Sequence, residues 1–356
     1  MPQNGSKHGK QYDRGAEDLG NIVALEHVNL QVEDQGLTTL FYISGLGLTR
    51  DPYLMTSIDN MWVNVGHSQF HLITGKPQHL RGRTGLVIPD REALLQRLDK
   101  MRKPLEGTRF AFKEHDDHVE TTCPWGNKLL IHEPGRFGRM QLGMPYVEFD
   151  VPAGSAKAIA DFYRKVFETP ASVDEKGDMP AARVSVGPSQ ELVFRETRSK
   201  LAAYDGHHIQ VYVANFSRPH KRLLERDLIT EESNKYQYRF EQITDLESGK
   251  PLFQIEHEVR SMTNPLYARP LVNRNPAQTN RNYVPGRDAW VAEPMEPEMD
   301  DPRMAMRQRR FEAVTRRRQA AAARSRATCR SRAGSITCPA RRTTTTPGST
   351  PRAASD

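Results

Sequence analysis

The sequence predicts an α+β fold of four βαβββ modules that form two paired half-barrels. An internal repeat is the first observation behind this prediction: FYISGLGL at 41–48 returns as FYRKVFET at 162–169, and GHSQFHLI at 66–73 returns as GPSQELVF at 187–194. WGNKLLIHE from residue 125 later returns as SGKPLFQIEHE from residue 248. The second observation is that each copy divides into two strand–helix–strand–strand–strand units. Residues 22–135 and 143–262 are therefore two copies of one double module.

The first copy contains modules one and two. Alternating apolar residues predict a strand at 27–32, and LTTLFYISGLGL at 37–48 is an amphipathic helix that ends in glycine. MWVNVG and QFHLIT are the next two strands. The order then restarts with the strand GLVIP, the helix REALLQRLDKMRK and the strands FAFKEHDD, HVETTC and KLLIHE.

The second copy contains modules three and four. The third module opens with the strand YVEFDV and the helix SAKAIADFYRKVF. The fourth opens with the strand HIQVYVAN and a helix around RPHKRLLERDL. A last apolar strand at 252–259 completes the repeat.

These boundaries divide the chain into five expected segments. They are a disordered arm at 1–20, a first domain at 21–138 (modules one and two), a second domain at 142–262 (modules three and four), an irregular Pro- and Asn-rich extension at 263–294, and a disordered Arg-rich tail at 295–356. The extension offers apolar anchors with which to wrap the body: Leu266, Tyr267, Leu271, Tyr283 and Trp290.

Charge is distributed unevenly along the 356 residues, whose formal net charge is +7. Residues 301–356 hold 14 Arg, no Lys and three acids, so the remaining 300 residues are mildly acidic. We therefore expect no nucleic-acid binding by the fold itself, and only the tail is a candidate for it, although solvation is the simpler interpretation of the tail.

No apolar run approaches the roughly 18 residues of a membrane-spanning helix, and the amino end lacks the apolar stretch of a secretory signal. Three cysteines, Cys123, Cys329 and Cys338, do not make a disulfide framework. The sequence thus predicts a cytoplasmic protein with no membrane partner, a monomer or homodimer that acts on a small molecule.

The ordered motifs resemble the vicinal oxygen chelate superfamily, which includes glyoxalases, extradiol dioxygenases, and fosfomycin and bleomycin resistance proteins. The resemblance rests on an early strand histidine in EHVNLQV, the FY…LGL helix end and the GNKLLIHE final strand, and it covers about 240 residues. It implies the glyoxalase-type fold of paired half-barrels, but it does not specify the reaction, because one fold hosts many chemistries.

The resemblance also implies where a metal ion binds, because the family's ligands lie on the first and last strands of each module. These positions fall on His27, His71, Thr84, Leu130, Tyr146, Leu192, His208 and Glu256. Only modules one and four carry ligand-type residues, so the resemblance implies one live site made of His27, His71, His208 and Glu256. This donor set suits Zn, Ni, Fe(II), Co or Mn.

Two points stay open at this stage. The register of the last strand leaves Gln254 as an alternative to Glu256, since both side chains lie on one strand face. The sequence also leaves open whether module one pairs with module four or with module two. Arg260, suited to an acidic substrate, and Tyr146 are the candidate substrate-binding residues.

Two classes of function follow. The first is a metal-dependent enzyme in which His27, His71 and His208 are ligands and Glu256 is a ligand or the catalytic base. A glyoxalase-like lyase or isomerase that forms an enolate-type intermediate is the leading interpretation, and an extradiol-type ring-cleaving dioxygenase is the alternative. The second class is a non-catalytic, resistance-type protein that binds a small molecule without metal.

Overall fold

The structure is a computed structural model that describes residues 12–53, 59–275, 277–279 and 281–285, and every structural statement below concerns those residues. All of them belong to one compact unit, Met1–Trp290. The expected tail at 295–356 lies outside the described residues, as do Trp290 and most of the arm at 1–20, of which a short turn, η1 (Gly15–Glu17), is described. None of the described helices is long and apolar enough to cross a membrane.

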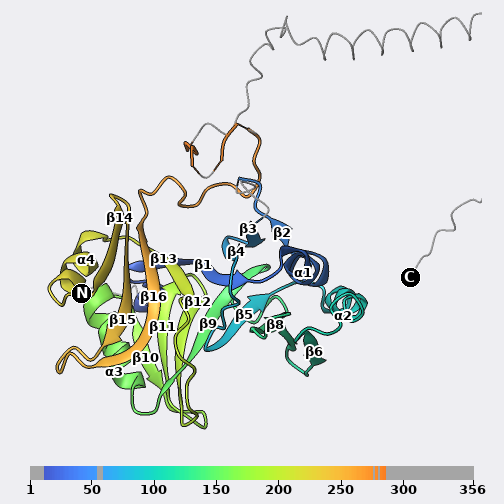
Figure 1. Ribbon diagram of the computed structural model, residues 1–356. Coiled ribbons are helices and arrows are strands. Elements are labelled where there is room, and N and C mark those ends of the chain that lie inside the picture. Colours follow the sequence, from blue (N-terminus) through green and yellow to red (C-terminus); the bar gives the residue numbers. More distant parts are fainter. Residues whose placement is uncertain (1–11, 54–58, 276, 280, 286–356) are drawn as a thin grey trace, which may run out of the picture. The chain divides into compact units, whose positions relative to one another are not determined.

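The chain forms four βαβββ modules, which confirms the expected fold class (Figure 1). Module one consists of β1 (Ile22–Val32), α1 (Gln35–Thr38) with its π-helical continuation η2 (Thr39–Gly45), β2 (Thr49–Arg50), β3 (Asn60–Val65) and β4 (Ser68–Thr74). Module two consists of β5 (Gly82–Val87), α2 (Arg91–Lys100), β6 (Ala111–Glu114), β7 (Val119–Thr122) and β8 (Lys128–His132).

The second copy repeats this order. Module three consists of β9 (Gly143–Pro152), α3 (Ala156–Phe162) with its continuation η3 (Tyr163–Phe167), β10 (Ala171–Asp174), β11 (Ala181–Gly187) and β12 (Gln190–Thr197). Module four consists of β13 (His208–Val213), α4 (Ser217–Leu224), β14 (Ile229–Asn234), β15 (Gln237–Thr244) and β16 (Pro251–Ser261).

Module one pairs with module four, and module two with module three, which answers the question that the sequence left open. The first sheet has the order β14-β15-β16-β13-β1-β4-β3-β2, and the second has the order β10-β11-β12-β9-β5-β8-β7-β6. Within a module the opening and last strands run parallel side by side, as β1 and β4 do. The opening strands of paired modules, such as β1 and β13, join antiparallel. Each sheet therefore takes one module from each expected domain, 21–138 and 142–262.

Each sheet turns one face toward a common apolar core, because successive side chains of a strand point to opposite faces. In β16, Phe253, Ile255 and Val259 are buried in this core. Phe253 of the first sheet packs against Phe149 and Phe194 of the second, and α3 contacts strands of both sheets. Each such ring contributes roughly 1.5–3 kcal/mol by leaving water. The opposite faces, which carry the polar residues, therefore remain available for a site.

The extension after β16 is ordered against module one. The buried guanidinium of Arg269 pairs with Asp51, with 2.6 Å between Nη2 and Oδ2. The ring of Tyr267 meets Tyr212 of β13 edge to face, and Tyr283 meets Tyr53 in the same way. Two aromatic contacts thus join tyrosines of the extension and the body, and a desolvated ion pair fixes the register of the extension.

A buried histidine in the core gives the fold a pH dependence. The Nε2 atom of His257 lies 2.7 Å from the hydroxyl of Tyr163, and its Nδ1 atom lies 2.9 Å from the carbonyl oxygen of Ile255. The ring also stacks on Phe240. Burial lowers the pKa of His257 to about 4. His257 therefore binds a proton near pH 6.5 in the unfolded chain, whereas in the folded chain it binds one only when the pH approaches 4.

We expect His257→Gln to flatten the fall in stability between pH 6.5 and pH 4. The pKa of the folded state is depressed, so the contribution of His257 is complete above pH 6.5 and is lost as the pH falls toward 4. The difference between wild type and variant across this window should reach about 3 kcal/mol, because one pKa unit corresponds to about 1.4 kcal/mol. Urea unfolding at several pH values measures it, and parallel profiles for the two proteins would contradict this interpretation.

Candidate metal centre

A polar cleft of about 390 Å³ opens on the outer face of the first sheet, where modules one and four join. Its walls come from β1, β3 and β4 on one side and from β13, β15 and β16 on the other. The cleft is lined by Asn29, Gln31, Trp62, His71, Ile73, Gln78, Gly206, His208, Gln237, Arg239, Glu258 and Arg260.

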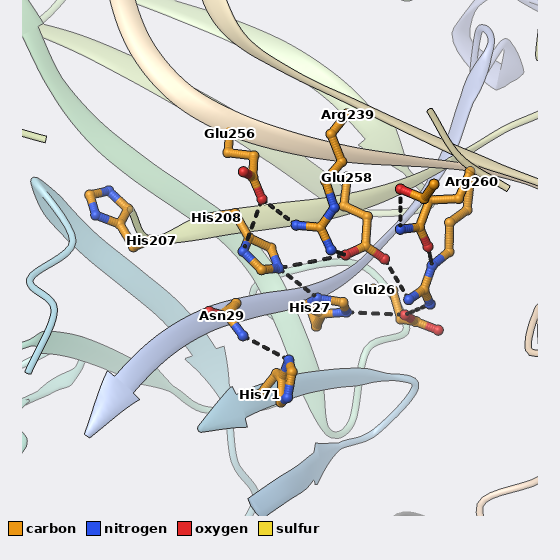
Figure 2. Close-up of polar contacts among 12 residues, drawn as sticks. Glu26, His27, Asn29, His71, His207, His208, Arg239, Glu256, Glu258 and Arg260 are labelled. Carbon is orange, nitrogen blue, oxygen red and sulfur yellow. Dashed lines mark hydrogen bonds and ion pairs between the residues drawn. The ribbon is translucent and has the colours of Figure 1, made fainter. Parts of the chain in front are cut away.

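Three histidines meet at this cleft, as Figure 2 shows. The antiparallel pairing of β1 with β13 sets His27 opposite Gln210 and Asn29 opposite His208, so His27 and His208 are diagonal neighbours on one face. Their Nε2 atoms are 3.5 Å apart. His71 lies opposite Asn29 on the parallel strand β4, and one nitrogen from each of the three rings lies within 4.8 Å of the others.

Two of these rings have a carboxylate beside Nδ1, the ring nitrogen that points away from the other histidine. The Nδ1 atom of His27 lies 3.2 Å from a carboxylate oxygen of Glu26, and the Nδ1 atom of His208 lies 3.3 Å from Glu256. An imidazole that donates its Nδ1 proton to a carboxylate carries its lone pair on Nε2. The two Nε2 lone pairs then face each other at 3.5 Å, an unfavourable arrangement that a cation between them relieves.

The site keeps the imidazoles of His71 and His208 neutral. Burial, followed by the charges of His27 and Arg239, lowers the pKa of His208 well below its ordinary value. Burial also lowers the pKa of His71 to about 2. Neutral imidazole is the form that binds a metal ion, so both rings are in the required state at neutral pH.

His71 is held more firmly than the other two rings. Its Nδ1 atom accepts a hydrogen bond from the Asn29 amide at 2.7 Å, and its Nε2 atom lies 2.9 Å from the Oδ1 atom of Asn60. The ring stacks on Trp62 with 3.7 Å between the ring centroids. Ligation through Nδ1 therefore requires Asn29 to release this ring nitrogen.

The carboxylate beside the Nε2 atoms belongs to Glu258. Its Oε2 atom lies 3.6 Å from Nε2 of His208, and its side chain is 3% exposed. Strand pairing explains this position: His71 faces Asn29 across β4 and β1, while Glu258 faces Gln210 across β16 and β13, two residues after His208. In the pseudosymmetric pair of modules, Glu258 is thus the counterpart of His71.

Glu256 and Gln254, the two candidates from the sequence for the fourth ligand, do not lie on the Nε2 side of His208. Glu256 faces His208 across the parallel pair and binds its Nδ1 side, so it orients the ring from behind. The amide of Gln254 donates to Glu241 at 2.9 Å, and its backbone carbonyl accepts from Arg81. Glu258, two residues further along β16, is the carboxylate that lies on the Nε2 side of His208.

Arg260 lines the cleft, as a substrate-binding residue would, but its nitrogens are committed to the protein. Its guanidinium pairs with Glu26 at 3.1 Å and with Glu258, and its Nε atom donates to Gln237 at 2.9 Å. Burial lowers the pKa of Arg260, yet the charges of Glu258 and Glu26 outweigh it and keep this pKa above its ordinary value. Arg239 similarly bridges Glu256 and Glu258.

Tyr146, the other candidate for substrate binding, lies on the second sheet. Module three pairs with module two, so Tyr146 of β9 lies opposite Gly85 of β5, and its hydroxyl lies 3.0 Å from Nε2 of His132. The ring fills the space in which a side chain at Gly85 would stand. It is not among the residues that line the cleft of the first sheet.

Several residues of the site gave no distinct signal in the sequence. Glu26, Asn29, Trp62, Arg239 and Glu258 contact the three histidines or their carboxylates. The alternation of charges in IEHEVR was the one available sign, because Glu256, Glu258 and Arg260 share one face of a strand.

No protein-family model matches the chain, and no curated protein matches it. Among solved structures, it is similar to glyoxalase I from Zea mays, with 10% identity over 67% of this chain and 92% of that chain and a TM-score of 0.48. A proposed dioxygenase from Bacillus subtilis subsp. subtilis str. 168 shares 16% identity over 74% of this chain and 90% of that chain, with a TM-score of 0.47. A catechol 2,3-dioxygenase shares 13% identity over 68% and 88%, with a TM-score of 0.25.

The order and pairing of the four βαβββ modules are those of the paired half-barrels that the resemblance implied. Sequence identities of 10–16% to these solved structures do not determine a reaction, so the residues of the cleft are the evidence for it.

We expect Arg260→Ala to cost about 3–5 kcal/mol of stability, because it leaves Glu26 and Glu258 buried without their shared cation. Arg218→Ala, which breaks the exposed pair with Glu168, is the matched control and should cost less than about 1 kcal/mol. Urea unfolding at pH 7 compares the two. Equal small losses would return Arg260 to the role of a free substrate-binding residue.

Proposed function

We propose that the cleft binds one divalent transition-metal ion and that the chain is a glyoxalase-like lyase or isomerase acting on a small oxygen-chelating substrate. The observation that carries this proposal is the pair of Nε2 atoms of His27 and His208, 3.5 Å apart and each backed by a carboxylate on Nδ1. His71 supplies a third imidazole and Glu258 a carboxylate. Three imidazoles and one carboxylate suit Zn, Ni, Fe(II), Co or Mn.

When bound, such an ion acts as a Lewis acid toward substrate oxygen atoms. The residues of the chain supply the proton transfer. Glu258 lines the cleft, whereas Glu256 lies behind His208, so Glu258 takes the role of base that the sequence assigned to Glu256. It removes a proton from the hydroxyl-bearing carbon beside a carbonyl, which leaves an enolate-type intermediate, and returns this proton to the former carbonyl carbon, while the hydroxyl proton passes to the former carbonyl oxygen. Hydrogen moves between neighbouring carbons, and no oxidant is consumed.

The cleft also indicates the kind of substrate. The amides of Gln31 and Gln237 give the cleft a polar lining, while Trp62 and Ile73 form a short apolar wall. A volume of about 390 Å³ admits a small molecule, near the lower end of the range for ligand pockets. These features suit a polar carbonyl compound with one apolar substituent, such as a 2-oxoaldehyde–thiol adduct.

A ring-cleaving dioxygenase is the second candidate, and one observation favours it. His27, His208 and Glu258 form a two-histidine, one-carboxylate set, which is the donor pattern of non-haem Fe(II) oxygenases. Oxygen uptake with catechols, by protein loaded with Fe(II), distinguishes this reaction from isomerisation. A protein that binds neither metal nor these substrates would be the non-catalytic, resistance-type alternative.

We expect purified full-length protein to bind metal at this cleft and a His27→Ala, His208→Ala double variant to lose that ion. His220→Ala removes a histidine that pairs with Glu232 on the surface and is the matched control. Elemental analysis after supplying Ni, Zn, Fe(II) or Mn and removing free ion measures the content. An unchanged content in the double variant would refute the proposed site.

Substitutions of Glu256 and Glu258 should have different effects, one on metal affinity and the other on kcat. Glu256→Gln should weaken metal binding 10–100-fold, because it removes the acceptor that orients His208. Glu258→Gln should lower kcat for isomerisation of a 2-oxoaldehyde–thiol adduct by at least about 100-fold, as expected for loss of a base. Chelator competition and a steady-state assay measure the two quantities, and a larger loss of kcat in Glu256→Gln would restore Glu256 as the base.

A further inference from the structure

The hairpin of β6 and β7, at the edge of the second sheet, gathers a separate group of metal-ligating side chains. His115, His118 and Glu120 each offer one ligand atom, and these atoms lie within 4.8 Å of one another. The backbone N–H of His115 donates to the carbonyl oxygen of His118 at 2.9 Å, so the two residues face each other across the turn. Glu120 is two residues after His118 and therefore lies on the same face of the strand.

Two features of His118 prepare it as a ligand. Its Nδ1 atom lies 2.7 Å from Oδ1 of Asp117, and Asp117 is itself held by Arg136 at 2.5 Å. As with His27 and His208, a carboxylate on Nδ1 leaves the lone pair on Nε2. The ring of His118 is parallel to that of His115, with 4.6 Å between centroids, so both rings have a set orientation.

His115 gives an independent indication of a missing partner. Its Nε2 atom is buried and has no hydrogen-bond partner among the described residues. A buried polar atom without a partner costs about 1–3 kcal/mol, so such an atom calls for an explanation. A cation shared with His118 and Glu120 supplies one.

The charges around the hairpin leave Glu120 available. Glu120 pairs with Lys128 at 3.8 Å, with both side chains exposed by more than a third, and such a surface pair is weak. The nearby guanidinium groups have their own partners: Arg136 binds Asp117, and Arg91 binds Glu114 at 3.0 Å. A divalent ion at the hairpin therefore meets the weakly paired carboxylate of Glu120. The guanidinium groups of Arg91 and Arg136 already have carboxylate partners.

We propose that His115, His118 and Glu120 form a second metal site, which binds a divalent ion of the Zn²⁺ class and bridges the β6–β7 hairpin. Two imidazoles and a carboxylate are a common donor set for Zn²⁺ that leaves further coordination positions open. The site does not use the module positions of the second sheet, where Thr84, Leu130, Tyr146 and Leu192 stand. It is independent of the cleft on the first sheet, and neither site requires the other.

Zinc stoichiometry of the full-length chain tests this proposal, with the first cleft disabled. The background is the His27→Ala, His208→Ala double variant, which should still bind one Zn²⁺ per chain. Adding His118→Ala should abolish this binding, whereas adding His67→Ala, which removes an exposed histidine of the β3–β4 turn, should leave it unchanged. Competition with a chromophoric chelator measures affinity, and elemental analysis measures content.

Conservative variants keep the test valid if His118→Ala disturbs the hairpin. Glu120→Gln and Asp117→Asn should each weaken Zn²⁺ binding at least 10-fold, the second because it frees the His118 ring. Affinity within twofold of the background in both variants would overturn the proposal, as would absence of bound zinc in the background. A wild type that binds one ion, lost only with His27 and His208, would refute the hairpin site and leave the proposed function intact.

Discussion

The antiparallel pairing of β1 with β13 is the constraint on which the site depends. Because Asn29 lies opposite His208 and Gln210 opposite His27, two histidines that are far apart in the sequence become neighbours. The parallel partners of these strands then bring His71 and Glu258 to the same place. A shift of one residue in this pairing would send one histidine to the apolar core and dissolve the group.

Charge balance is the second condition for the cleft. Glu26, Glu256 and Glu258 lie together with Arg239 and Arg260, and every acid in this group contacts at least one arginine. Neither set alone could be desolvated at acceptable cost, since a buried charge requires a partner. The arginines balance the charge of the carboxylates, and carboxylate oxygens of Glu26 and Glu256 lie beside the Nδ1 atoms of His27 and His208. Arg260, a candidate substrate contact in the sequence, thus holds Glu26 and Glu258 beside the histidines.

The repeat was sufficient to predict the four modules, and the family resemblance brought His27, His71 and His208 into one proposed site. Both rest on patterns that span many residues and tolerate small errors. The carboxylate was not predictable at the same level, because Gln254, Glu256 and Glu258 share a strand face and only the register of β16 against β13 separates them. Tyr146 lies away from this cleft because module three pairs with module two, and this pairing is a matter of long-range topology that local sequence does not determine. The stacked rings of His115 and His118 were not predictable either, since their facing depends on cross-strand geometry.

The pairing of first with last modules makes the chain nested. His79 donates its backbone N–H to Asp205 at 2.7 Å, and the amide of Gln78 donates to the carbonyl of the same residue, so the segment that holds modules two and three leaves and re-enters the first sheet at one place. The second sheet is, in effect, a domain inserted into the first. His27 and His208 are 181 residues apart. During synthesis, all strands of the second sheet are therefore translated before β13, the partner of β1, is complete. The cleft between modules one and four is then assembled after the second sheet, once the fourth module has been translated.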